Sequence, residues 1–169
     1  MRKITALITM LIMLLSFSAC NAPAIEPEES PTPTATLESQ ETIVFADPVL
    51  EAMVRGTMGK PEGAITAADA EAVRRLDLNL EWERYTAGWM PIKDLGGLEY
   101  FKNLEYLDLS DHAITDVTPL AGLNKLTLLA LGGNPIADIA PLAGLTNLKA
   151  LILSGCAAQD YSPLANLTS

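Results

Sequence analysis

Few side chains in this sequence could support acid–base or nucleophilic chemistry, and they lie far apart. His112 is the only histidine among 169 residues, and the two cysteines are Cys20 and Cys156. Nucleophilic catalysis needs a Ser or Cys beside an oriented base, and phosphate chemistry needs a glycine-rich loop. Because the sequence offers neither pattern, nor a metal-ligand cluster, we predict no catalytic residue, no cofactor and no enzymatic activity.

Four aspartates recur at intervals of 22 residues: Asp94, Asp116, Asp138 and Asp160. Stacked carboxylates could bind Ca²⁺, but Ca²⁺ sites usually add a loop rich in backbone carbonyl ligands, and none is visible here. Asp side chains at the start of turns commonly accept hydrogen bonds from nearby backbone N–H groups. We therefore expect each carboxylate to stabilise a turn in its own segment, and we assign no metal site.

The spacing of the aspartates belongs to a longer repeat. Residues 104–125, 126–147 and 148–169 are three copies of one 22-residue unit, with apolar residues at seven matching positions. Only Ala158 in the last copy is small. Such a regular column predicts a solenoid, in which each unit buries its apolar edge against the next. In the middle copy the seven positions are Leu126, Leu129, Leu131, Ile136, Ile139, Leu142 and Leu145.

Each copy predicts one short strand followed by a turn. The Leu-x-Leu pattern alternates inward and outward side chains, and a proline at a fixed position of the return segment favours a 3₁₀ turn. The predicted fold class is α/β, a leucine-rich-repeat solenoid of short parallel strands with a 3₁₀ or irregular convex side. Leucine-rich repeats accept Asn or Cys after the strand. We expect a buried structural role for the residues at that position, His112, Asn134 and Cys156.

Residues 42–75 predict a helical cap before the repeats. Asp47-Pro48 is an N-cap followed by proline, and Gly59 and Pro61 end that helix. A capping-box pattern at 66–69 opens a second short helix, which we expect to run to about Arg74. The repeat array is expected over 76–169, with an insertion at 81–91 that interrupts the first repeat.

The first 19 residues are typical of an export signal. A basic start precedes an uncharged apolar run over 4–17, which is shorter than the about 20 residues of a membrane-spanning helix. Ser18-Ala19-Cys20 resembles a bacterial lipoprotein signal, although Phe17 replaces the usual Leu. The resemblance implies that Cys20 becomes the lipidated first residue of a chain anchored to the outside of the membrane. An ordinary signal peptide cut nearby is the alternative.

Residues 20–41 are rich in Pro, Glu, Ser and Thr and contain no basic residue. Such a segment cannot bury enough apolar area to offset its ordering entropy, so it is expected to be a disordered tether. Removing the signal would change the net charge from −10 to −12, because it takes away Arg2 and Lys3 and no acid. This charge argues against nucleic acid and against direct binding of anionic lipid.

A partner-binding surface is expected on the concave face, where strand side chains that do not enter the core point outward. The outward positions are apolar and small in the last two copies, and Leu128 beside Ile152 is not needed for the core. Isolated exposed apolar residues are common on any protein, so a solvated face is the alternative. The candidate contact residues are Tyr106, Asp108, Leu128, Ala130, Ala150 and Ile152.

The insertion adds two tryptophans, Trp82 and Trp89. Specific interfaces take about 20–30 residues a side, more than the strand face supplies, and aromatic residues dominate binding hot spots. The tryptophans are therefore candidate contacts. The alternative, which we favour, is that they pack over the cap and the first repeat, since leaving both in water is costly.

The sequence LxxLxLxxN-xIxDxxPLxxL at residues 126–145, together with the helical cap, resembles the internalin-like leucine-rich-repeat domains of bacterial surface proteins. The resemblance covers about 45–169 and implies a non-catalytic module that binds a protein on the cell surface or on a host. Alternatives are the recognition arm of a longer surface enzyme or adhesin, and a structural envelope spacer. Because no capping unit follows repeat 148–169, we also expect either a longer protein or self-association through the last repeat.

Overall fold

The computed structural model describes residues 41–79 and 90–167. These residues lie within one compact unit, Thr34–Ser169. The predicted signal, the lipidation site Cys20, nearly all of the tether, and both tryptophans of the insertion lie outside the described residues.

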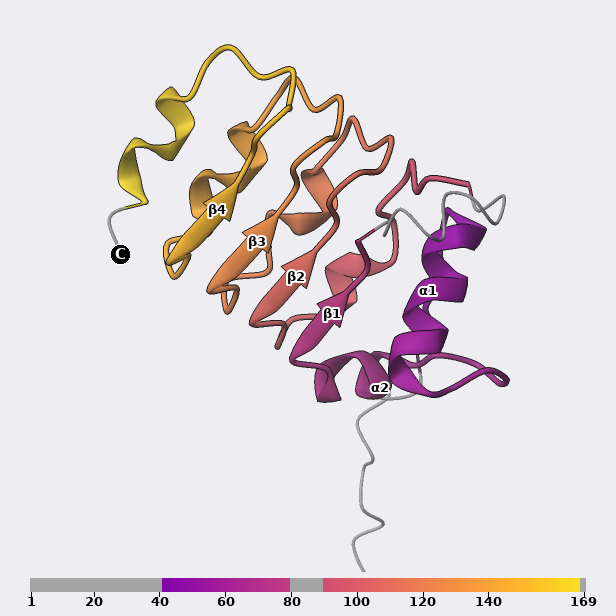
Figure 1. The fold of residues 1–169 in the computed structure, drawn as a ribbon. Coiled ribbons are helices and arrows are strands. Elements are labelled where there is room, and N and C mark those ends of the chain that lie inside the picture. Colours follow the sequence, from indigo (N-terminus) through magenta and orange to yellow (C-terminus); the bar gives the residue numbers. More distant parts are fainter. Residues whose placement is uncertain (1–40, 80–89, 168–169) are drawn as a thin grey trace, which may run out of the picture. The chain divides into compact units, whose positions relative to one another are not determined.

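Four three-residue strands form one parallel sheet in the order β1-β2-β3-β4 (Figure 1). They are β1 Arg75–Asp77, β2 Tyr106–Asp108, β3 Leu128–Ala130 and β4 Ala150–Ile152. The register pairs matching repeat positions, so that Leu76, Leu107, Leu129 and Leu151 stand side by side. Because sequence neighbours are also sheet neighbours, the predicted solenoid is confirmed.

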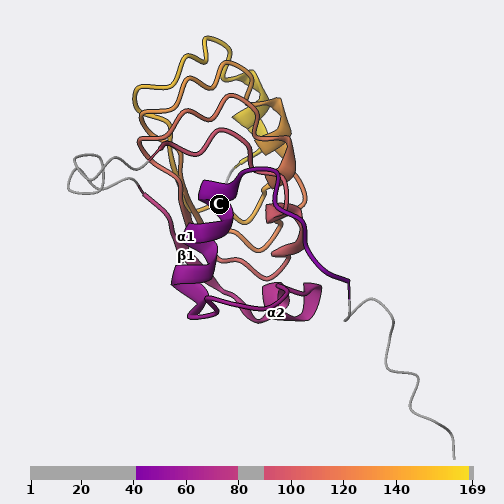
Figure 2. The same cartoon turned by 90° about the vertical axis from the view of Figure 1, so that its right-hand side faces the viewer.

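Short 3₁₀ helices follow the strands, one on each segment that returns the chain across the other side of the array (Figure 2). They are η2 Leu98–Tyr100, η3 Thr118–Leu120, η4 Ala140–Gly144 and η5 Ser162–Asn166. In the last three, proline occupies the first turn, where its missing N–H costs no hydrogen bond and its fixed φ suits a tight turn. The predicted 3₁₀ side is therefore confirmed.

The core runs as a continuous apolar column through the array. All seven repeat positions are buried in the copies at 104–125 and 126–147. In the copy at 148–169, Leu151, Leu153, Leu164 and Leu167 are only half-buried, since among the described residues they have a neighbouring repeat on one side only.

The N-terminal cap closes the other end of the column. Helix α1, Pro48–Met58, buries Leu50, Met53 and Val54 and packs against β1, and it ends at Gly59 with a left-handed φ of 64°. Helix α2, Ala67–Ala72, carries the predicted capping box and packs against η2. The expected end of α2 near Arg74 is wrong by two residues: Val73 is already extended, because the chain there enters β1.

Candidate partner-binding surface

The outward side chains of the four strands form a surface of two columns, which we call the strand face. Alternation along each strand places one core leucine between two outward residues, and the parallel register aligns these across strands. The first column is Arg75, Tyr106, Leu128 and Ala150, and the second is Asp77, Asp108, Ala130 and Ile152.

The polar half of the strand face is held together by contacts between its own side chains. The Arg75 guanidinium carbon lies 3.4 Å from the centre of the Tyr106 ring, and Arg75 Nη2 lies 3.1 Å from Asp77 Oδ2. Asn79 donates to the other Asp77 oxygen at 2.8 Å. A stacked guanidinium at an exposed site contributes only about 0.5–1 kcal/mol, but it orients the aromatic ring. Sequence reasoning did not select Arg75 as a contact residue, although its position in the same column as Tyr106 was a usable signal.

The other half of the strand face is apolar and carries no charge. Ile152 remains 45% exposed, and Leu128 and Ala150 are half-buried. Ala130 was expected to be an exposed contact residue, but it is only 2% exposed. The longer side chains of Asp108 in β2 and Ile152 in β4 stand at the matching positions on either side of its methyl group. The strand face therefore offers Tyr106, Leu128 and Ile152 as its larger apolar side chains.

The side chain at the turn position after a strand forms hydrogen bonds with the backbone of the neighbouring repeat. Asn134 Oδ1 accepts from the N–H of Ile114 at 3.1 Å, and its Nδ2 donates to the carbonyls of Leu109 and Leu131 at 2.7 and 2.9 Å. All these groups are buried. Asn134 thus satisfies backbone groups of its own repeat and of the preceding one, in keeping with the structural role predicted for it.

His112 makes the equivalent contacts one repeat earlier. Its Nδ1 accepts from the N–H of Ile92 at 3.2 Å, and its Nε2 lies 2.6 Å from the carbonyl of Leu78. Because an amide N–H can only donate, Nδ1 must be unprotonated and Nε2 must carry the hydrogen. Burial lowers the pKa of His112, against the opposing effects of the Leu78 carbonyl and nearby carboxylates, so the ring is neutral near pH 7.

Cys156 makes part of the same set of contacts in the last repeat. Its Sγ donates to the carbonyl of Leu131 at 3.3 Å, and burial raises the pKa of the thiol. Since the thiolate is the nucleophile of cysteine chemistry, this environment favours the unreactive form. The three turn residues therefore serve the repeat, and none is paired with a catalytic partner in the described part of the chain.

Each aspartate of the 22-residue column accepts a hydrogen bond from the backbone N–H two residues further on. The acceptors Asp94, Asp116, Asp138 and Asp160 all make this bond at 2.8 Å. The predicted role of these carboxylates in their own turns is confirmed. Within residues 41–79 and 90–167, no group of three or more His, Cys, Asp or Glu side chains is placed to hold a metal ion.

Asp47 has a second role that sequence reasoning did not anticipate. As the N-cap of α1 it accepts at Oδ1 from Val49 and Leu50, and at Oδ2 it accepts from Lys93 at 2.8 Å. Burial opposes its negative charge, but together these backbone hydrogen bonds and one from Asp94 hold its pKa below the usual value. One carboxylate thus connects the cap to the first repeat and fixes one end of the array.

Comparisons with known proteins bear on the fold. No protein-family model matches the sequence, and no curated protein matches it either. Among solved structures, the internalin inlF from Listeria monocytogenes is 36% identical, with a TM-score of 0.70 over 79% of this chain. Internalin C2 from the same species is 34% identical, with a TM-score of 0.68 over 77% of this chain. The chain has an internalin-like leucine-rich-repeat fold.

A third solved structure, the functional domain of InlJ from Listeria monocytogenes, shares this fold at 23% identity. Its TM-score is 0.60 over 79% of this chain and 29% of InlJ. The internalin-like chain spans 38% of the length of inlF and 56% of the length of internalin C2.

Proposed function

We propose that this internalin-like chain is a non-catalytic module that binds a protein on the bacterial cell surface. The observation that carries the proposal is the strand face: Tyr106, Leu128 and Ile152 lie on three neighbouring strands of one parallel sheet. Aromatic and aliphatic anchors on a rigid scaffold bind at a low entropic cost. The polar half around Arg75 and Asp77 supplies charged groups that set the orientation of the partner.

The strand face alone is smaller than the about 20–30 residues that each side of a specific interface contributes. An interface of that size would need a flanking segment, and the insertion with Trp82 and Trp89 is the candidate, set against the packing over the cap and the first repeat that we favour. Trp82→Ala and Trp89→Ala decide its role. Loss of partner capture at unchanged stability supports contact with the partner, and loss of stability supports packing on the cap.

The central experiment is chemical cross-linking on intact cells, followed by identification of the captured protein. Leu128→Asp and Ile152→Asp should reduce capture at least about tenfold, since a charge desolvated in an interface costs more than the 1.4 kcal/mol of one decade. Ala121→Asp, an exposed position beside η3, is the matched control and should leave capture unchanged. Equal capture by all three variants would contradict binding through the strand face. Unselective capture would instead favour a structural spacer.

The location on the cell surface is part of the same proposal. Among the described residues no helix is long and apolar enough to cross a membrane. The proposed membrane attachment is through lipid on Cys20. Cys20→Ala should release the protein into the medium or leave the precursor uncut. A Cys20→Ala protein that remains membrane-bound at mature size would contradict lipid anchoring.

A further inference from the structure

The polar half of the strand face places two carboxylates side by side. Asp77 of β1 and Asp108 of β2 are register partners, so they occupy matching outward positions on neighbouring strands. Parallel strands lie about 4.8 Å apart, and like charges opposite each other on one face of a sheet are destabilising. A sheet shaped by stability alone would have an unlike charge or a neutral residue at one of these positions.

Only one of the two carboxylates has a cation beside it. Arg75 Nη2 lies 3.1 Å from Asp77 Oδ2, and the guanidinium is stacked on the ring of Tyr106. Asp108 is half-buried and accepts at Oδ1 from the N–H of Ser110 at 2.9 Å. Within residues 41–79 and 90–167, no lysine or arginine forms an ion pair with Asp108. Its negative charge is therefore not neutralised by the described part of the chain.

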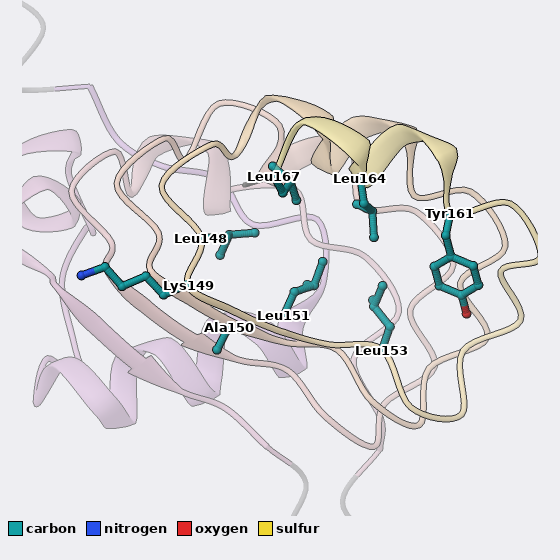
Figure 3. Close-up of a pocket in the computed structure, with 8 residues that line it drawn as sticks. All are labelled: Leu148, Lys149, Ala150, Leu151, Leu153, Tyr161, Leu164 and Leu167. Atoms are coloured by element: carbon teal, nitrogen blue, oxygen red, sulfur yellow. The ribbon is translucent and has the colours of Figure 1, made fainter. Parts of the chain in front are cut away.

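The apolar half of the strand face begins next to this charge. Ile152 of β4 lies in the same column as Asp108, with the short Ala130 of β3 between them. Figure 3 shows the outward direction of the face in β4, where Ala150 points away from the inward Leu151. Two strand spacings, about 9–10 Å, separate the charged position from the apolar one. A partner segment that contacts both needs a charged and an apolar side chain within that distance.

We propose that the partner places a cationic side chain, an arginine or a lysine, between Asp77 and Asp108, and an apolar residue of the same segment against Leu128 and Ile152. The inference rests on the proposed function, because it names the class of protein segment that the strand face receives. A partner cation relieves the repulsion between the two carboxylates. A local rule of sheet stability is thus broken where the chain binds, as is common at functional sites.

Charge complementarity decides between a basic and an acidic segment. The chain carries a net charge of −10, which attracts basic partners and repels acidic ones. Arg75, the cation nearest to these carboxylates, is a poor target for an acidic partner, because Tyr106 covers one side of its guanidinium and Asp77 already accepts from it. The segment that fits the strand face is therefore basic and apolar.

Asp108→Asn tests the repulsion in the free protein. The asparagine oxygen can still accept from Ser110, so the substitution removes the charge and keeps the turn hydrogen bond. Asp138→Asn is the matched control: it removes the same charge, and Asp138, which precedes η4 outside the strand face, accepts from the N–H of Ala140 at 2.8 Å in the same pattern. The urea midpoint should rise more for Asp108→Asn than for Asp138→Asn. An equal or smaller rise, as expected if Arg84 of the insertion were the counter-ion, would overturn the proposal.

Nuclear magnetic resonance titrations test the occupant with three blocked tripeptides, Leu-Thr-Arg, Leu-Thr-citrulline and Leu-Thr-Glu. In an extended chain their two outer side chains lie on one side, about 7 Å apart, and the long arginine stem covers the remaining distance. The Arg peptide should shift the amide signals of Asp108 and Ile152. The citrulline peptide has the same shape without the charge and should bind about fivefold more weakly, which is about 1 kcal/mol, the upper range for an exposed ion pair.

The variants complete the titration. Asp108→Asn should weaken binding of the Arg peptide by the same factor, and Asp138→Asn should bind it as the wild type does. The proposal is contradicted by an Arg peptide that leaves the strand-face signals unshifted, or by a citrulline peptide that binds equally well. Tighter binding of the Glu peptide would place an acidic partner at Arg75 and would also contradict it.

Partner capture on intact cells separates this inference from the proposed function. If Leu128→Asp and Asp108→Asn both reduce capture and Asp138→Asn does not, both are supported. If Leu128→Asp reduces capture and Asp108→Asn leaves it unchanged, the strand face binds a protein without a cation at the carboxylates, and this inference alone fails. If capture is unchanged in Leu128→Asp and Ile152→Asp, the proposed function fails with it.

Discussion

Replacing Asn134 by alanine tests whether the turn residues hold neighbouring repeats together. The substitution removes the acceptor of the buried Ile114 N–H and the donor to the buried carbonyls of Leu109 and Leu131. A buried N–H without a partner costs about 1–3 kcal/mol, and each lost neutral hydrogen bond about 1 kcal/mol. The free energy of unfolding should therefore fall by roughly 3–5 kcal/mol for Asn134→Ala.

Urea unfolding followed by circular dichroism measures this loss, with the midpoint shifting at a nearly constant m-value. Asn147→Ala is the matched control, because Asn147 Nδ2 makes one exposed hydrogen bond, to the carbonyl of Asn124 at 2.6 Å. It should cost less than about 1 kcal/mol. Asn134→His, which copies the residue that the preceding repeat uses, should recover part of the loss. Equal losses in Asn134→Ala and Asn147→Ala would refute the proposed role of the turn position.

Three further changes test the core, the ring of His112 and the N-terminal cap. Leu129→Ala, at a fully buried position, should lower the free energy of unfolding by about 2–5 kcal/mol in urea titrations, whereas Leu128→Ala on the half-buried strand face should cost less than about 1 kcal/mol. Similar losses in the two variants would contradict the strand register. Because burial lowers the pKa of His112 in the folded state, the unfolded chain takes up a proton first as pH falls below about 6.5, and stability should decrease with it. His112→Asn should remove this contribution to the pH dependence of the free energy of unfolding. If the free energy of unfolding of the variant changes with pH as steeply as that of the wild type, a neutral buried ring is contradicted. Asp47→Ala should cost about 1–3 kcal/mol, more than a typical N-cap, because it also releases the Lys93 N–H, and Asp47→Asn should cost less. Unfolding curves that do not separate these two variants would argue against the link to the first repeat.

The strand face shows where sequence reasoning stopped. Alternation along each strand correctly placed Tyr106 and Ile152 outward, because the side-chain period of a strand is fixed at two. The same rule placed Ala130 outward, but its neighbours in the adjacent strands bury it. The stacking of Arg75 on Tyr106 was also not anticipated, since cross-strand contacts depend on side-chain rotamers as well as on register.

Local sequence patterns were enough to predict the repeat, the strand order, the 3₁₀ side and the N-terminal caps of both helices. Each of these depends on local chemistry that recurs every 22 residues: an inward leucine, a proline in the first turn, an aspartate that accepts from the N–H two residues on. The contacts that hold one repeat to the next became visible only in the folded chain. The contacts of Asn134 and His112 reach backbone groups 20 to 34 residues away, and Asp47 reaches Lys93 across 46 residues. Those distances are set by the stacking of complete repeats, so no local pattern could reveal them.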